Sequence, residues 1–179
     1  WSVRALTRFY LGSSDDWALP GAYGSGASAA VFRPATGLWS VRDLTRLFFG
    51  AASSLPVPAD YDGDGTAEIA VFQPALSRWA IRGLTALYFG QSSDEPVPSD
   101  GDGDGTVDPA VFRPSTGFWA FRSVTGIYFG GAGDRPVPGG YGGPGAASPA
   151  IFRPATGLWS VRSLTRFFLG SSSDLPASR

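Results

Sequence analysis

Short apolar segments alternate along the chain with stretches rich in glycine, proline and serine. In one representative stretch they fall at residues 56–61, 69–72, 79–82 and 84–89. In the third of these segments, Trp-Ala-Ile-Arg, alternation puts Trp79 and Ile81 on one face of an extended strand and the other two side chains on the opposite face. The pattern therefore predicts four short strands, and no stretch has the periodicity of an amphipathic helix.

The links between these segments have turn chemistry. The second and third segments are joined by Pro-Ala-Thr-Gly or a close variant, in which proline cannot continue a strand ladder and glycine can supply a positive φ. The fourth segment is apolar at consecutive positions, as in Leu87-Tyr88-Phe89. Such a run predicts a strand that is covered on both faces.

The same pattern recurs about every 40 residues. The phrase FRPATGLWSVR occurs at 32–42 and again at 152–162, with FQPALSRWAIR and FRPSTGFWAFR between them. The tryptophans of the pattern are Trp1, Trp39, Trp79, Trp119 and Trp159. Four strands in roughly 40 residues, repeated, predict an all-β protein, a β-propeller of four-stranded blades. One blade cannot bury its aromatic face alone, so we expect the tryptophans to form the core between blades.

We predict a single repeat domain over residues 1–179. It comprises a partial blade at 1–12, four complete blades at 17–50, 55–90, 95–130 and 135–170, and the start of a further blade at 171–179. The incomplete ends are compatible with a ring closed imperfectly by a split fifth blade, and equally with a segment of a longer blade array. In an array, unpaired terminal strands would invite pairing with another copy of the chain.

Composition limits the chemistry that this chain can perform. Hydrophobic residues make up 43% of it, which is typical of a folded protein, and the formal net charge of -1 offers no basic surface to nucleic acid. No apolar run is long enough to predict a membrane span. Cys, His and Lys are absent. Because most common nucleophiles and general bases are therefore missing, we predict no catalytic residues.

Two loops between the first and second strands of neighbouring repeats carry acidic residues at alternating positions. They read DYDGDGTAE over 60–68 and DGDGDGTVD over 100–108. Four carboxylates within nine residues repel one another strongly unless a cation is present, and glycine permits a tight loop that aims several oxygens at one centre. An all-oxygen ligand set favours Ca²⁺ over Zn²⁺ or Mg²⁺. A solvated Asp-Gly turn would account for one such loop, but two in register predict two calcium sites.

The predicted ligands are the carboxylates at the first, third, fifth and ninth positions and the backbone carbonyl at the seventh. They are Asp60, Asp62, Asp64, Thr66 and Glu68 in the first loop, and Asp100, Asp102, Asp104, Thr106 and Asp108 in the second. The corresponding loops at 21–30 and 140–148 contain no carboxylate, so we expect no metal there. Calcium is therefore expected to stiffen a turn rather than to perform chemistry.

The phrases PVPADYDGDGTAEIAVFQP and PVPSDGDGDGTVDPAVFRPSTGFW resemble the bacterial FG-GAP-like repeats, also called VCBS-type repeats, which are related to the blades of integrin α-subunit propellers. The resemblance extends over essentially the whole chain. It implies propeller blades, Ca²⁺ held by the loop between first and second strands, and an extracellular or cell-surface setting in adhesion or recognition. It also assigns the ligand roles to the same ten residues, with Glu68 in place of the usual Asp.

These features favour a binding or adhesion module without catalytic activity, which recognises a glycan or protein ligand. Trp17 occupies the position that varies most between repeats, so we expect an exposed indole that can stack on a sugar or a partner surface. The alternative is a structural repeat protein that forms surface filaments or polymers. A glycosidase with paired carboxylates is disfavoured, because the remaining acids lie mainly in link loops. The recurrent arginines predict structural pairing with loop aspartates or stacking on aromatic rings.

Overall fold

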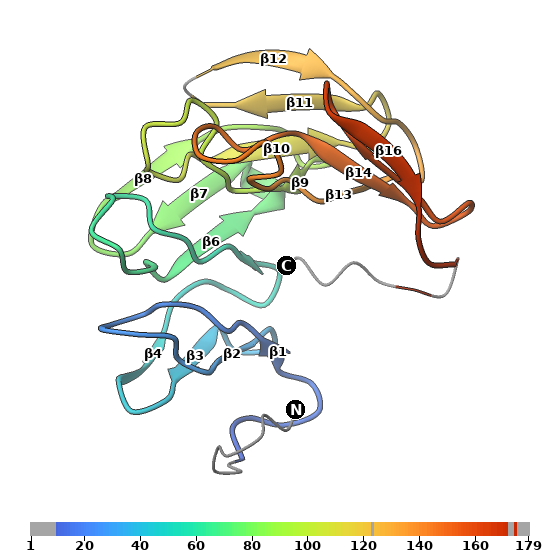
Figure 1. Cartoon of the computed structure of the whole chain (residues 1–179). Coiled ribbons are helices and arrows are strands. Elements are labelled where there is room, and N and C mark those ends of the chain that lie inside the picture. The colour runs from blue at the N-terminus through green and yellow to red at the C-terminus, as the bar shows by residue number, and fades with distance from the viewer. Residues whose placement is uncertain (1–9, 123, 172–173, 175–179) are drawn as a thin grey trace, which may run out of the picture.

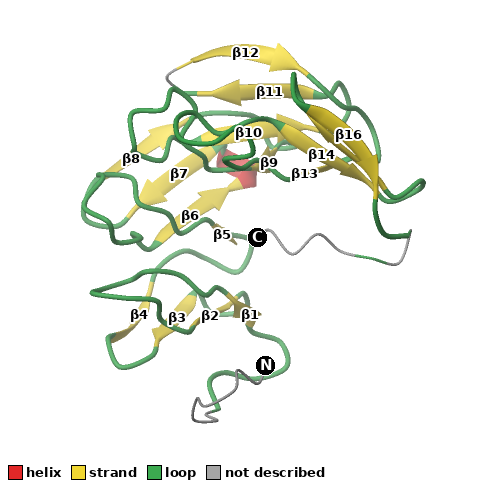
Figure 2. Cartoon of the chain, in the orientation of Figure 1, coloured by secondary structure: helices red, strands yellow, loops and turns green. Residues whose placement is uncertain are grey.

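Four four-stranded antiparallel sheets are arranged as a four-bladed β-propeller (Figure 1). The computed structural model describes residues 10–122, 124–171 and 174. Within those ranges the helical structure is confined to one short 3-10 turn, η1 (Pro74–Leu76), and the rest is strand or loop (Figure 2). The prediction of an all-β propeller with four complete blades is confirmed. The pieces assigned to a fifth blade fall largely on residues outside the described ranges.

Each blade takes its four strands in chain order. Blade 1 consists of β1 (Trp17–Ala18), β2 (Ala30–Arg33), β3 (Leu38–Val41) and β4 (Thr45–Phe48). Blade 2 consists of β5 (Leu55–Pro56), β6 (Ala70–Gln73), β7 (Arg78–Ile81) and β8 (Thr85–Tyr88). Blade 3 consists of β9 (Glu95–Pro96), β10 (Ala110–Arg113), β11 (Phe118–Phe121) and β12 (Val124–Tyr128). Blade 4 consists of β13 (Arg135–Pro136), β14 (Ala150–Arg153), β15 (Leu158–Val161) and β16 (Thr165–Phe168).

The first strand of a blade is shorter than predicted. A strand was expected over 56–61, whereas β5 ends at Pro56 and only an isolated bridge between Ala59 and Glu68 follows. Proline has no N–H to donate to a ladder, and the chain carries Pro56 and Pro58 on either side of the single residue between them. Regular pairing therefore stops after two residues.

Neighbouring blades pack through two different faces. The Trp face of a blade carries the phenylalanine of its second strand and the tryptophan of its third, as Phe32 and Trp39 do in blade 1. The Val face of the next blade carries the valine or isoleucine of the second strand and the small residue paired with it, as Val71 and Ala80 do in blade 2. The same arrangement joins blade 2 to blade 3 and blade 3 to blade 4.

The tryptophans of the third strands form this core, as predicted. Trp39, Trp79 and Trp119 are 0% exposed. The indole N–H of each donates a hydrogen bond to the backbone carbonyl ten residues later, at 2.8–3.2 Å. The polar atom of the ring is thereby satisfied while the ring itself is removed from water, which is what a buried tryptophan requires.

The outer strand of each blade is not covered on both faces, contrary to the prediction. The middle residue of its apolar triplet is about three-quarters exposed in all four blades, at Phe48, Tyr88, Tyr128 and Phe168. These strands end their sheets, as β12 does at the border of blade 3 (Figure 1). Only the side chains on the Trp face, such as Leu47 and Phe49, pack against the next blade. Consecutive apolar residues here thus reflect one buried and one exposed face.

The Trp face of blade 4 is open. Trp159 stacks on Phe167 with ring centroids 6.1 Å apart but is only half-buried. Phe167 is 41% and Leu169 65% exposed, whereas their counterparts in the first three blades are partly buried against a following blade. Within the described ranges, the core cluster of blade 4 contains residues of that blade alone.

None of the helical structure in the described part of the chain is long and apolar enough to cross a membrane.

Candidate metal site in two neighbouring loops

The acidic loops connect the first and second strands of blades 2 and 3. In blade 2 an isolated bridge between Ala59 and Glu68 closes the loop, and in blade 3 a bridge between Ser99 and Asp108 does so. The loops without acids have corresponding bridges, Gly21 with Ser28 and Gly139 with Ser148. The same backbone closure therefore forms with and without the carboxylates.

In the blade 2 loop, carboxylate oxygens of Asp60, Asp62 and Glu68 lie within 4.8 Å of one another. The two oxygens of Asp60 also accept hydrogen bonds from the backbone N–H groups of Gly63 and Gly65, at 2.7 and 2.8 Å. Both glycines have positive φ, 79° and 88°, a backbone conformation that other residues rarely adopt. The glycines therefore let the chain curl around the first carboxylate.

In the blade 3 loop, carboxylate oxygens of Asp100, Asp102 and Asp104 lie within 4.8 Å of one another. Asp100 repeats the role of Asp60, because it accepts hydrogen bonds from the N–H groups of Gly103 and Gly105 at 2.6 and 3.0 Å. Each loop thus brings three of its four carboxylates together. The carboxylates at the first and third loop positions belong to the group in both loops.

The remaining predicted ligands lie differently in the two loops. In both, the fifth-position carboxylate accepts hydrogen bonds from the backbone N–H and the hydroxyl of the following threonine, which pairs Asp64 with Thr66 and Asp104 with Thr106. Asp64 is outside the first group, although Asp104 belongs to the second. Asp108 is outside the second group, and one of its oxygens faces the N–H of Gly101 at 3.4 Å.

Burial, hydrogen bonds and neighbouring charges shift the pKa values of three carboxyl groups in these loops. Burial raises the pKa of Glu68, and the neighbouring negative charges of Asp62, Asp60 and Asp64 add to the rise, against a hydrogen bond from the Tyr61 N–H. The hydroxyl and N–H of the following threonine lower the pKa of Asp64, and the same contacts lower that of Asp104. A cation placed among the carboxylates would relieve the repulsion that Glu68 experiences.

The donor set fits a hard cation. All ligand atoms that the loops offer are oxygens, and the sequence contains neither histidine nor cysteine. Several carboxylates with backbone carbonyls and water suit Ca²⁺, which takes six to eight oxygen ligands in a flexible shell. Asp60, Asp62 and Glu68 would hold the ion in blade 2, and Asp100, Asp102 and Asp104 in blade 3.

Backbone hydrogen bonds connect each loop to the loop of the next blade, which sequence reasoning did not anticipate. The N–H of Val107 in the blade 3 loop donates to the carbonyl of Asp60 in the blade 2 loop, at 2.8 Å. Ala67 donates to Ala22 at 2.5 Å, and Ala147 to Asp100 at 2.7 Å, in the same way. The four loops therefore form one hydrogen-bonded row across the blades. The one signal in the sequence is that the three donors are small or β-branched apolar residues at the same position of the repeat.

An aromatic ring lies at the base of each loop; it is buried in blades 1 and 3, half-buried in blade 2 and 44% exposed in blade 4. In three blades a tyrosine, namely Tyr23, Tyr61 or Tyr141, donates its hydroxyl to the carbonyl four residues earlier, at 2.7–2.9 Å. Burial raises the pKa of all three phenols. They are therefore structural anchors that stay protonated at neutral pH.

Blade 3 replaces this tyrosine with Gly101 and compensates in two places. Phe121 stands where the other blades have valine or isoleucine, and a Cβ atom built on Gly101 would lie 2.8 Å from its ring. The hydroxyl of Ser99 donates to the carbonyl of Val97, the group that a tyrosine reaches in the other blades. The loop base is thus rebuilt from two residues.

Three of the acids outside the loops accept two hydrogen bonds each from an arginine, and a fourth, Asp43, forms an exposed ion pair with Arg42. Asp94 accepts two hydrogen bonds from the guanidinium of Arg113, at 2.7 and 3.0 Å, and its side chain is 0% exposed. The other two pairs are Asp16 with Arg33 and Asp134 with Arg153. Arg113 also lies over the Phe118 ring, 5.5 Å from its centroid. The predicted structural pairing of these arginines is confirmed.

Trp17 lies in β1 and is 38% exposed. Its ring also contacts Phe32 edge-on, with centroids 6.4 Å apart. The predicted exposure of this indole is therefore only partial, since Trp17 contributes to the rim of the blade core. A role in ligand binding stays a prediction.

Comparison of the chain with models of protein families, with curated proteins and with solved structures finds no match. The resemblance to FG-GAP-like repeats therefore rests on the sequence phrases.

Proposed function

We propose that this chain is a non-catalytic extracellular or cell-surface binding module, a β-propeller whose blades 2 and 3 are stiffened by two Ca²⁺ ions. The observation that carries the proposal is the gathering of three carboxylates within 4.8 Å in each of two neighbouring loops. Each loop is also tied to the next blade by a backbone hydrogen bond. Calcium bound there orders the contact between blades as well as the turn itself.

The proposed absence of catalytic activity is supported by the roles of three acids outside the loops. Asp16, Asp94 and Asp134 are each bound to an arginine. A general acid or base must be free to exchange its proton with a substrate, and a carboxylate held by two hydrogen bonds from arginine is not.

The proposed class of ligand, a glycan or a protein surface, rests on the proposed extracellular or cell-surface setting. Extracellular modules commonly bind calcium with dissociation constants of about 10⁻⁴–10⁻³ M, and two exposed loops with that role suit a secreted or surface protein. A glycan or a protein surface is the expected ligand, and Trp17 is the residue we expect to contact it. Its indole is flat, partly exposed and backed by Phe32.

A structural role in surface filaments is the second candidate. It is favoured by one observation, the exposed apolar Trp face of blade 4, with Phe167 and Leu169. Mass measured in solution separates the two candidates, because a binding module stays monomeric at micromolar concentration whereas a filament protein forms long assemblies.

Calorimetric titration of the chelator-treated chain with CaCl₂ tests the proposal. We expect two ions per chain, and one ion per chain for Asp62→Asn or Asp102→Asn, because asparagine keeps the side-chain acceptor but loses the charge. Asp15→Asn, an exposed acid outside the loops, is the matched control and should leave the stoichiometry at two. Binding that is undiminished in both loop variants would contradict the assignment.

A further inference from the structure

Every blade carries an exposed aromatic ring at the same position of its outer strand. Phe48, Tyr88, Tyr128 and Phe168 are 73–76% exposed, so packing does not require an apolar side chain there. The position is nevertheless aromatic in all four blades. It is phenylalanine in two and tyrosine in two, so the flat ring recurs and the hydroxyl does not. A ring presented to solvent once per blade needs a role outside the fold.

The exposed ring ends a row of three side chains that crosses the blade on its Val face. In blade 1, Arg33 of β2 pairs with Leu38 of β3, and Leu38 pairs with Phe48 of β4. Residues directly opposite one another in an antiparallel sheet share a face, so these three side chains are neighbours. We call the set an outer row, and it contains one exposed ring and one arginine in every blade. The other outer rows are Gln73, Arg78 and Tyr88 in blade 2, Arg113, Phe118 and Tyr128 in blade 3, and Arg153, Leu158 and Phe168 in blade 4.

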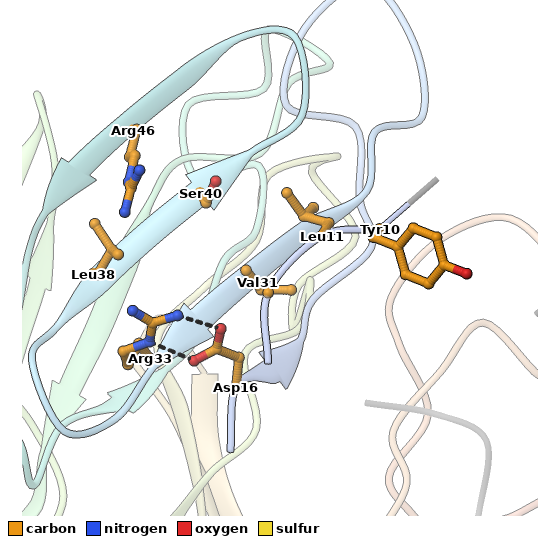
Figure 3. Close-up of a pocket in the computed structure, with 9 residues that line it drawn as sticks. Tyr10, Leu11, Asp16, Val31, Arg33, Leu38, Ser40 and Arg46 are labelled. Atoms are coloured by element: carbon orange, nitrogen blue, oxygen red, sulfur yellow. Dashed lines mark hydrogen bonds and ion pairs between the residues drawn. The ribbon is translucent and has the colours of Figure 1, made fainter. Parts of the chain in front are cut away.

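The arginine of each outer row is held in a fixed orientation. In blades 1, 3 and 4 an aspartate accepts hydrogen bonds from its Nε and Nη2 groups. Figure 3 shows this for Arg33 and Asp16, with Leu38 and Arg46 on the next two strands. The Nη1 groups of these three arginines donate to none of the described residues, so each can donate to an oxygen of a ligand. In blade 2, Arg78 is held by Gln73, whose Oε1 accepts from Nη1 at 3.0 Å.

Positive charge exceeds negative charge along the outer rows. Arg46, Arg78 and Arg166 form no ion pair with any described residue. Arg46 and Arg166 lie on the outer strands, two residues before the exposed ring and on the same face. Asp15 interacts with Arg33 and offsets part of this excess in blade 1. The acidic loops lie at the other ends of the strands, because they precede β6 and β10 whereas the outer rows lie where these strands end.

We propose that the four outer rows bind an anionic polysaccharide, one that contains uronic acid. The apolar face of a sugar ring stacks on the exposed aromatic ring, and the carboxylate of the uronic acid accepts hydrogen bonds from the arginines. Four equivalent rows engage several segments of one polymer, so weak contacts combine into firm binding. The inference rests on the proposed binding function, whose ligand it names, and it is independent of calcium. It places the main contacts on the outer strands rather than at Trp17.

A polysaccharide fits the outer rows better than the other polymers that contact aromatic rings. A protein partner is expected to cover a contiguous apolar patch depleted of charge, whereas each ring here stands beside a guanidinium on a separate blade. Single-stranded nucleic acid also stacks on rings beside arginines. Its affinity depends on many uncompensated cations, and the arginines of three outer rows are already paired with aspartate.

Biolayer interferometry on immobilised hyaluronan, a polymer in which uronic acid alternates with an amino sugar, tests the proposal. The methyl ester of hyaluronan, which lacks the negative charge, and oligo(dT) are the comparison surfaces, and all buffers contain CaCl₂. A ring variant replaces the four exposed aromatics with alanine: Phe48→Ala, Tyr88→Ala, Tyr128→Ala and Phe168→Ala. The matched control removes exposed leucines at the opposite strand ends: Leu44→Ala, Leu84→Ala and Leu164→Ala. Thermal melts show that each variant is folded.

We expect the wild-type chain and the leucine control to bind hyaluronan alike, and its methyl ester much more weakly. Avidity predicts that the ring variant binds about 100-fold more weakly than wild type. Tyr88→Ala alone should weaken binding about threefold, which keeps the test decisive if the ring variant fails to fold. Arg78→Gln should also weaken binding, because it removes a cation and leaves the ring.

Undiminished hyaluronan binding by the folded ring variant, or by Tyr88→Ala, overturns the proposal. If Trp17→Ala then abolishes binding, the proposed binding function stands and only its location changes. Equal binding to the methyl ester, no binding to hyaluronan, or tighter binding to oligo(dT) also overturns the assignment of an anionic polysaccharide. None of these results bears on the two calcium sites, which calorimetric titration tests separately.

Discussion

Acids and arginines are matched blade by blade in this protein. Asp94 and Asp134 accept hydrogen bonds from an arginine of the second strand and also from the backbone N–H three residues earlier. Blade 2 departs at both positions together: Ser54 replaces the aspartate and Gln73 the arginine. The paired loss is physically sensible, because an unpartnered buried charge is costly whereas a neutral pair is not.

We predict that the Asp16–Arg33 pair makes stability depend on acidity. The hydrogen bond from Arg33 holds the pKa of Asp16 below its ordinary value of 3.8. A carboxyl whose pKa is lowered by folding stabilises the protein above its ordinary pKa and loses that contribution as pH falls through the folded-state value. Urea denaturation of wild type and Asp16→Asn at pH 7 and pH 3 measures this contribution. The free-energy gap between the two proteins should narrow at pH 3, and an equal gap at both values would count against the pair.

The aromatic exchange in blade 3 supplies a second prediction. Phe121→Val should destabilise the protein by about 1–3 kcal/mol by opening a cavity, and Gly101→Tyr by a similar amount through overpacking. The double variant restores the arrangement of the other blades and should recover most of the loss. Chemical denaturation of the four proteins gives the coupling energy. Additive losses would show that Gly101 and Phe121 do not share one space.

At the scale of strands, hydrophobic periodicity in the sequence predicted some strands correctly and others only in part. Alternation in Trp-Ser-Val-Arg and its relatives correctly predicted the third strand and its two faces, because one of those faces is always buried. The outer strand was misjudged since Leu87 and Phe89 pack on the next blade while Tyr88 between them does not. An exposed aromatic and a buried one look alike in a sequence. The extent of the first strand was also misjudged, because proline limits hydrogen bonding that apolar character alone would allow.

At the same scale, the acidic loops show what spacing can and cannot supply. Alternation of acids correctly located two clusters of three carboxylates. It could not distinguish Asp64 and Asp108, which lie outside the clusters. Asp64 and Asp104 make the same hydrogen bonds to their threonines, yet only Asp104 joins a cluster, so neither residue type nor spacing separates them. The backbone hydrogen bond from Val107 to Asp60 could not be predicted from spacing either, because it depends on how neighbouring blades pack against each other.

Across the whole molecule, each blade interface combines an apolar contact with a backbone link. The Trp face packs on the Val face in the core, and the first loops are joined by hydrogen bonds at one edge of the blades. Two of the three links involve an aspartate of an acidic loop as acceptor, Asp60 or Asp100. Calcium bound in those loops would therefore stabilise the contacts of blade 2 with blade 3 and of blade 3 with blade 4, and so the relative placement of most of the propeller.

Thermal unfolding in excess CaCl₂ and in excess chelator tests this account most directly. At calcium concentrations about 100-fold above the dissociation constant, one site adds about 2.7 kcal/mol. For a chain of this size each site corresponds to a rise in Tm of roughly 5–10 °C, and two filled sites to about twice that rise. The Asp62→Asn/Asp102→Asn double variant should show no rise, and Mg²⁺ should replace Ca²⁺ poorly. Equal Tm values for the wild-type chain with calcium and with chelator would contradict the claim that calcium stiffens this propeller.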